Sequence, residues 1–425
     1  MDSEQKSERM LSPYRVLDLA DEKGLLCGKI LGDLGADVIK VEKPGGDPTR
    51  NIGPFYKDIR DPEKSLYWFA FNTSKRGITL NIKKPEGQGI FKKLVEKADV
   101  VIESFSPGYM DKLGLGYSGL SKMNPRIILT SVSPFGQEGP YRDYKTSDLV
   151  STALSGVLYI TGDADRPPVR ISFPVAYQFA GAEAALGTLM ALYYRNITGE
   201  GQQVDTSTQW SMNPAQYDVI GWWAALKKIY KRQGPFLIRP NTGIIFRQHW
   251  PCKDGYVTFY YFGGPTGAAS NRALVQWIGE EGFDVAFMKD RDWPKFDYAL
   301  ISQEEVNRME KPTAEFFKSH TKKELLAGAT KRGVMLYPAA TPKDMLESEQ
   351  LAFRKYWAKL EHPELGAEIT YPDACFKASE TTCTIRRRAP LIGEHNEEIY
   401  QKELGFSAKE LVALKKRGII YRIKK

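Results

Sequence analysis

The chain has 425 residues, of which 42% are hydrophobic and 26% are charged, and its formal net charge is +8. This length and composition are typical of a globular protein with about two domains. No apolar run reaches the roughly 18 residues that a membrane helix needs, and the first residues are polar and partly acidic, so we expect no membrane span, no secretory signal and a cytoplasmic location.

The first half of the chain alternates short β-type runs with helical stretches. Helices are predicted over 24–35, closed by Gly35, over 85–98, with proline in the first turn, and over 178–195. The predicted strands are "YRVLDLA", "ADVIKVE", "RGITLNI", "DVVIESF", "PRIILTSVS" and "GQQVDTS". Strands of this apolar kind, separated by helices of about 10 to 15 residues, predict a parallel α/β sheet with both faces covered.

The character of the sequence changes after about residue 215. The segment from there to 262 is rich in aromatic residues and contains "DGYVTFYYF", which is typical of an antiparallel strand after a turn. The segment 305–350 has the spacing of amphipathic helices. We therefore predict a large α/β domain whose first part is 1–224, and a second, smaller α/β domain over 225–380. The aromatic residues can line a pocket for a bulky group, although aromatic stripes are more often core.

Cysteine and histidine are too scattered for a metal site. None of them forms a close pair or a His-x-His or HExxH pattern, and the expected compartment keeps thiols reduced, so we interpret the cysteines as structural and expect no metal. These residues are Cys27, Cys252, Cys375, Cys383, His249, His320, His362 and His395.

The positive net charge is compatible with nucleic acid, an anionic membrane or a small polyanion. The basic residues are spread along the chain, with a dense group at 386–388, and no nucleic-acid-binding motif accompanies them. We therefore expect no nucleic-acid partner. The string "GLGYSG" at 114–119 fits a dinucleotide-binding pattern, but the preceding residues predict a helical turn instead of the strand that such a site requires.

Six blocks of sequence, in order, closely resemble the family III CoA-transferases, the group of the formyl-CoA and carnitine CoA-transferases. The blocks are "VLDLADEKGLLCGKILGDLGADVIKVEKPGGDPTR", "NTSKRGITLNIKKPEGQ", "ADVVIESFSPGYMDKLGLGY", "NPRIILTSVSPFGQEGPY", "LSGVLYITGDADRPPVR" and "RRRAPLIGEHNEEI". The resemblance implies a doubly wound large domain that binds coenzyme A or acyl-CoA, a C-terminal segment (381–425) that returns to it, and two interlocked chains.

Cations predicted at the carboxyl ends of parallel strands suit the phosphates of coenzyme A, because α/β sheets bind anions at that edge. On this argument Lys43, Lys75, Arg76 and Lys112 are candidate phosphate contacts. The family pattern adds Leu80, Ser104 and Phe105 along the adenine and pantetheine track, and Lys145 nearer the thioester end. For each residue the alternative is a surface cation or a core side chain.

The aspartate nucleophile of the family is missing. In the family an aspartate at the start of a small-residue helix attacks the thioester and forms a mixed anhydride, as a carboxylate can. In "PVAYQFAGAEAALG" the equivalent position is Tyr177, or Gln178 if the alignment slips by one. A phenol with a reference pKa of about 10 and without an evident base is a poor replacement. The catalytic residue of this chain is therefore unknown.

Two further departures lie near the expected thioester pocket. The stretch "LDLADEKGLLCG" is one residue shorter than the family pattern and carries Glu22 and Lys23 where small or neutral residues are usual. At the position of the proton-carrying histidine of the related racemases stands Ser147, so only Asp148 matches and α-proton exchange lacks its base.

Three hypotheses remain open. The chain is the subunit of a heteromeric CoA-transferase that lacks the nucleophile, paired with a homologous subunit that carries the aspartate, as in the succinyl-CoA:benzylsuccinate transferases. Alternatively, it is a self-sufficient transferase or isomerase with different chemistry, or a non-catalytic CoA-binding or nucleic-acid-associated protein. Site geometry outranks fold analogy in choosing among them.

Overall fold

The computed structural model describes residues 9–213, 217–239, 241–298 and 300–421. Parts of the predicted aromatic-rich and C-terminal segments lie outside these ranges. The chain divides into two compact units, the first with Met1–Leu158, Ile171–Leu226 and Leu351–Lys425, the second with Tyr159–Arg170 and Lys227–Gln350. The sequence-based division differs from these units, since it places 351–380 in the small domain and 159–170 in the large one.

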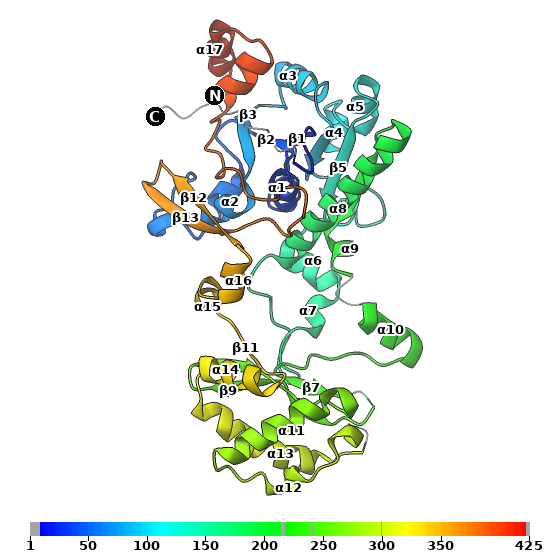
Figure 1. Ribbon diagram of the computed structural model, residues 1–425. Helices are drawn as coiled ribbons and strands as arrows, with labels where there is room; N and C mark the ends of the chain where they lie inside the picture. Colours follow the sequence, from blue (N-terminus) through cyan, green and yellow to red (C-terminus); the bar gives the residue numbers. More distant parts are fainter. Residues whose placement is uncertain (1–8, 214–216, 240, 299, 422–425) are drawn as a thin grey trace. The chain divides into compact units, whose positions relative to one another are not determined.

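A six-stranded parallel sheet with the order β3-β2-β1-β4-β5-β6 forms the centre of the first unit (Figure 1). This order confirms the predicted α/β class with a doubly wound parallel sheet. Each predicted strand of the first half is present. The bounds are β1 Arg15–Asp18, β2 Asp37–Glu42, β3 Lys75–Thr79, β4 Val100–Glu103, β5 Ile128–Ser133 and β6 Gln203–Ser207.

Neighbouring residues of the same strand enter two different hydrophobic layers, because side chains alternate between the faces of a sheet. Val16 and Val100 pack with helices α1 (Leu25–Asp33) and α8 (Val175–Thr198) on one face. Leu17 and Val101 pack on the other face with α3 (Pro85–Val95), α5 (Tyr117–Met123) and the C-terminal segment. Helices therefore cover both faces, as the apolar strands predicted.

The helices of the first unit include one of 24 residues, α8, which runs beside β5 (Figure 1). Its bounds and those of the other elements of this unit are α1 Leu25–Asp33, α2 Leu66–Phe71, α3 Pro85–Val95, α4 Tyr109–Lys112, α5 Tyr117–Met123, α6 Asp148–Leu154, α7 Val157–Ile160, α8 Val175–Thr198, α9 Thr208–Ser211, α10 Tyr217–Leu226, α16 Glu349–Phe353, β12 Trp357–His362, β13 Ala367–Pro372 and α17 Ala408–Lys416. Two of these, α7 and α16, extend across the unit boundaries.

The C-terminal segment is built into the first unit beside β3. The Asn396 side-chain oxygen accepts the Thr79 N–H at 2.9 Å, and the Tyr400 hydroxyl donates to the Thr79 carbonyl at 2.8 Å. Further along, Leu411 and Ile419 enter the same hydrophobic layer as Leu17. The last strand on this side of the sheet is thus covered by residues more than 300 positions later in the chain.

The second unit has its own hydrophobic core under an antiparallel sheet of order β11-β10-β9. The predicted antiparallel strand is β10, and the predicted helical segment holds α13 and α14. The bounds are β7 Phe236–Ile238, β8 Ile245–Arg247, β9 His249–Cys252, β10 Gly255–Thr258, α11 Gly264–Glu280, α12 Ala286–Lys289, α13 Gln303–Ser319, α14 Lys322–Arg332, β11 Tyr337–Pro338 and α15 Pro342–Leu346. Within the described ranges, no helix of either unit has the length and apolar character to cross a membrane.

Candidate functional site

A cleft of about 600 Å³ opens at the carboxyl ends of β1, β2, β3 and β4. It lies where the chain order of the sheet reverses, since β1 leads to β2 and β3 on one side while β4 leads to β5 and β6 on the other. Doubly wound α/β proteins bind ligands at this switch point. The lining residues are Leu19, Asp21, Val41, Lys43, Pro44, Asp47, Pro48, Leu80, Asn81, Ile82, Lys83, Ser104, Phe105, Ser106 and Tyr109.

Four of the residues singled out from the sequence meet in this cleft: Lys43, Leu80, Ser104 and Phe105. Lys43 directly follows β2 and is exposed, so its ammonium group is available to a ligand. Leu80 is buried, and the Phe105 ring packs at a tilt against Tyr109 with ring centroids 4.8 Å apart. Their roles as coenzyme A contacts stay predictions, but the structure places them together.

The positional argument was wrong for Lys75 and Arg76, which begin β3 and so lie at its amino end. Lys75 is fully buried and its ammonium contacts the Asp18 carboxylate at 2.8 Å and the Leu25 carbonyl at 2.9 Å. Arg76 forms ion pairs with Asp37, Glu398 and Glu403. Both cations are thus paired with acidic side chains of the chain itself.

The remaining two predicted residues are not among those that line the cleft. Lys112 is exposed at the last position of α4, the helix that Tyr109 begins. Lys145 is exposed in the loop before α6. Sequence reasoning also missed Lys83, an exposed cation at the carboxyl end of β3 that lines the cleft.

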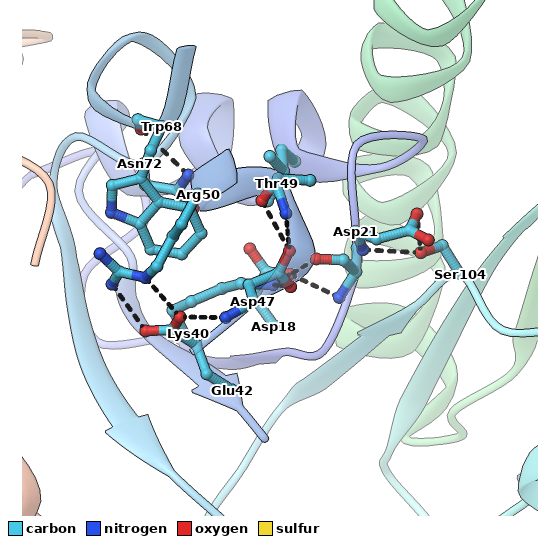
Figure 2. Close-up of polar contacts among 12 residues, drawn as sticks. Asp18, Asp21, Lys40, Glu42, Asp47, Thr49, Arg50, Trp68, Asn72 and Ser104 are labelled. Carbon is cyan, nitrogen blue, oxygen red and sulfur yellow. Dashed lines mark hydrogen bonds and ion pairs between the residues drawn. The ribbon is translucent and has the colours of Figure 1, made fainter. Parts of the chain in front are cut away.

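Hydrogen bonds join Asp21 and Ser104, two residues that line the cleft (Figure 2). The Ser104 hydroxyl donates to Asp21 Oδ1 at 2.7 Å and accepts the Asp21 N–H at 2.8 Å, which ties the ends of β1 and β4 together. Lys23 forms an ion pair with the same Asp21 carboxylate. Asp21 is therefore held by contacts from two sides.

Tyr177 lies in the first turn of α8, the helix that packs against α1. The two helices run side by side and touch where Gly181 has no side chain, since a Cβ at Gly181 would lie 2.8 Å from the Cβ of Leu26. Tyr177 precedes Gly181 by one helical turn. The carboxylate of Glu22, in the turn before α1, is close enough to raise the pKa of the Tyr177 phenol.

The surroundings of Tyr177 are apolar and negatively charged. The residue is 5% exposed, and burial raises the pKa of its phenol, as do the nearby carboxylates of Glu22, Asp21 and Asp148. Burial and the same carboxylates also raise the pKa of Tyr67. An ionised phenolate is thus disfavoured twice, which supports the expectation that tyrosine is a poor nucleophile here.

The other positions that the sequence comparison singled out near Tyr177 supply no evident carboxylate nucleophile. Gln178 is half-buried beside Tyr67, and Ser147 caps α6 by accepting the Val150 N–H. Asp148 accepts the Ala176 N–H at 2.9 Å through Oδ1, so it caps the first turn of α8, where no other acid is present. We interpret Asp148 as a structural residue.

Glu103, at the end of β4, is an acid that sequence reasoning missed. It is 4% exposed, and burial raises its pKa to about 7, while its hydrogen bond with Ser131 and the Phe105 N–H (2.7 Å) lower the pKa. No sequence pattern marks a buried acid within an apolar strand. It is therefore a titratable group at the switch point near neutral pH.

The other motifs have structural explanations. The string 114–119 follows the helical turn α4, as predicted, and no strand leads directly into it. Cys27 is buried, and burial raises its pKa to about 12. In the part of the chain that the structure describes, no three His, Cys, Asp or Glu side chains gather as a metal site would require.

The sheet order and the cleft together define a doubly wound α/β protein with a ligand-sized site at the switch point. Comparison with known proteins gives the family: the chain belongs to CoA-transferase family III, whose model matches residues 11–396. This confirms the resemblance inferred from the sequence and supports the enzyme class and CoA thioester substrates.

Two curated relatives and one solved structure extend over nearly the whole chain. The chain is 35% identical to the succinyl-CoA:(R)-benzylsuccinate CoA-transferase subunit BbsE of Thauera aromatica (96% of this chain and 98% of that protein). It is 32% identical to the succinyl-CoA–D-citramalate CoA-transferase of Chloroflexus aurantiacus (98% and 100%). A crystal structure of a CAIB/BAIF family protein from Brucella suis superposes with a TM-score of 0.78 at 29% identity (93% and 100%).

Proposed function

We propose that this chain is the subunit of a heteromeric CoA-transferase that lacks the nucleophile, and that it pairs with a homologous, aspartate-bearing chain. The assembly moves CoA from an acyl-CoA thioester to a carboxylic acid, and we place it in the cytoplasm. The observation that carries the proposal is Tyr177, a buried phenol with raised pKa where the family has its aspartate. Both relatives are named as succinyl-CoA transferases, which makes succinyl-CoA the first donor to test.

Coenzyme A binds, in this proposal, in the cleft at the carboxyl ends of β1 to β4. Lys43 and Lys83 bind its phosphates, because they are the exposed cations of that lining. Phe105 and Leu80 supply the apolar wall for adenine and pantetheine. Lys112 and Lys145 remain candidates for contacts outside this lining.

An exposed apolar stripe on α8 supports the proposal that a partner chain binds to this unit. Leu186, Met190, Tyr193 and Ile197 recur at helical spacing on the face opposite the buried alanines, and Trp210 on α9 is 75% exposed. Exposed apolar side chains grouped along one face of a helix are typical of protein interfaces. We assign this face to the homologous subunit, in the interlocked arrangement that the family resemblance implies. One relative is named as a subunit, which fits this assignment.

Calorimetry of the purified protein with CoA tests the site. The affinity is expected to fall with rising salt, and Lys43→Glu to weaken binding at least about tenfold, because a cation is replaced by an anion beside the phosphates. Lys122→Glu is the matched control, since Lys122 is exposed on α5 and does not line the cleft. An affinity for CoA that Lys43→Glu leaves unchanged would overturn the proposed site. Duplex DNA bound more tightly than CoA would favour the nucleic-acid hypothesis.

Measurements of CoA transfer test whether this chain lacks the nucleophile. The chain alone is expected neither to transfer CoA nor to become acylated by succinyl-CoA, and co-expression with an aspartate-bearing homologue should give an active heteromer. In that heteromer Tyr177→Phe should leave turnover nearly unchanged, whereas the partner's aspartate changed to asparagine should abolish it. A hydroxylamine-sensitive acyl adduct on this chain during turnover would instead establish self-sufficient chemistry.

A further inference from the structure

Lys43 stands on a loop whose own sequence gives it little rigidity. The loop "KPGGD" contains two glycines with positive φ, Gly45 at +93° and Gly46 at +96°. Glycine has the largest backbone freedom of all residues, so an unsupported loop of this composition would lose much entropy when a ligand orders it. Something else must hold Lys43 in place for tight binding.

The contacts that hold the loop come from buried charges at the end of β2 (Figure 2). The Asp47 N–H donates to Glu42 Oε2 at 2.7 Å, and Glu42 also accepts from Arg50 through two bonds of 2.6 and 2.8 Å. The Asp47 carboxylate lies 3.8 Å from the Lys40 ammonium and accepts from the N–H and hydroxyl of Thr49. The loop is thereby closed back onto the strand from which it leaves.

The same network reaches the neighbouring wall of the cleft. Lys40 is fully buried, lies 3.5 Å from Asp18 Oδ1 and donates to the Ala20 carbonyl in the turn after β1. Burial alone would lower the pKa of Lys40, but the carboxylates of Asp18, Asp47 and Glu42 raise it, so the group stays charged. Lys40 therefore connects the turn after β1 with the loop after β2, and both line the cleft.

Buried ions are not needed for stability, since apolar side chains of similar volume often stabilise a protein as well or better. In some proteins paired buried charges instead select one geometry. Arg50 is held from several sides: its guanidinium lies 3.8 Å above the ring of Trp68 while it donates to Glu42 and to the Pro390 carbonyl.

We propose that Lys40, Asp47 and the Glu42–Arg50 pair are positioning residues that hold Lys43 in its ligand-binding position before coenzyme A arrives. The inference rests on the proposed function, because it takes the cleft as the CoA site. It adds that the affinity for CoA depends on these buried charges, of which only Asp47 lines the cleft, through the position that they give Lys43.

The variant Asp47→Asn of the full-length protein tests the positioning role, because a pure charge effect and a positioning effect change the Kd for CoA in opposite directions. Asparagine keeps the acceptor for Thr49 but loses the attraction to Lys40. If charge alone mattered, removing a carboxylate beside an anionic ligand would tighten CoA binding. The positioning role predicts the reverse, a rise of about fivefold in the Kd for CoA, from the cost of ordering the loop on binding.

A double-mutant cycle with Lys43→Ala identifies the route of the effect. If Asp47 acts through Lys43, then Asp47→Asn should change the Kd less than about twofold when Lys43 is already alanine. Asp33→Asn is the matched control: Asp33 is equally buried, accepts from Ser74 at 2.6 Å, and lies near the amino end of β3, away from the cleft. It should lower thermal stability and leave the Kd unchanged.

The outcomes separate this inference from the proposed function. Wild-type protein that binds no CoA would overturn both. Wild-type binding with an unchanged or lower Kd for Asp47→Asn, an equal effect in the Lys43→Ala background, or an equal effect of Asp33→Asn would overturn the positioning role alone. Lys40→Met, if it folds, should raise the Kd at least as much as Asp47→Asn, and a Kd equal to wild type would contradict the role of Lys40.

Discussion

Two helical glycines should respond oppositely to the same substitution. Gly28 lies in α1 against the buried pair of Asp18 and Lys75, and a Cβ there would be 2.2 Å from Asp18 Oδ2 and 3.1 Å from Lys75 Nζ. Gly89 lies in the middle of α3 with no atom within 4 Å of an added Cβ. Alanine therefore fits at Gly89, whereas at Gly28 the carboxylate must move.

The magnitudes follow from the contacts. Asp18 is fully buried between two lysines, so displacing it separates a buried ion pair, which costs about 3–5 kcal/mol. The higher helix propensity of alanine offsets about 1 kcal/mol of this. We expect Gly28→Ala to lower the free energy of unfolding by about 2–4 kcal/mol, and Gly89→Ala to raise it by about 0.5–1 kcal/mol.

Urea denaturation followed by tryptophan fluorescence measures both changes, with the buried Trp68 as a reporter in the first unit. A second measurement, CoA affinity, should weaken for Gly28→Ala only, since Asp18 also orders the turn after β1 through the Ala20 N–H. Equal stability of Gly28→Ala and wild type, or shifts of the same sign for both variants, would refute the close-packed ion pair beneath α1.

Three further predictions concern stability and reactivity. Burial raises the folded-state pKa of Glu103 to about 7 from the ordinary 4.5, so wild-type stability should fall by about 3 kcal/mol relative to Glu103→Gln as the pH rises from 4.5 through 7; parallel pH profiles would contradict this. Deletion from Arg386 onward should abolish folded protein because it removes the partners of Thr79, and a well-folded truncated chain would disprove this coupling. Cys375 is exposed and should react with iodoacetamide before the buried Cys27, whose pKa is raised to about 12, as mass spectrometry of native protein can show.

The parallel sheet could be predicted because its strands carry a local signal. Apolar runs bounded by glycine, proline and helical stretches fix both the type of element and its burial on two faces. The same signal placed Lys43 correctly, since it follows the strand that ends at Glu42. Fold class and one wall of the cleft therefore follow from local patterns alone.

The error at Lys75 is one of position along the strand. Lys75 directly precedes the predicted strand "RGITLNI" and is the first residue of β3, so it lies at the amino end, whereas Lys83 follows the predicted strand and lines the cleft. Lys40 and Glu103 were missed for a different reason: a charged residue inside an apolar strand is stable only with partners from distant segments, and the sequence does not name those partners.

In the proposed function Tyr177 replaces the nucleophilic aspartate, and the acidic surroundings of Tyr177 fit that proposal physically. An aspartate at this position would face the carboxylates of Glu22, Asp21 and Asp148, which already raise the pKa of the phenol there. Like charges at short range would raise the pKa of that aspartate as well and reduce the ionised fraction that can attack a thioester. The tyrosine stays neutral, fills the space at the start of α8 and adds no negative charge beside these carboxylates. Glu22 thus makes the helix start a poor place for a carboxylate nucleophile, while the cleft at the strand ends, which does not depend on that nucleophile, keeps its cations.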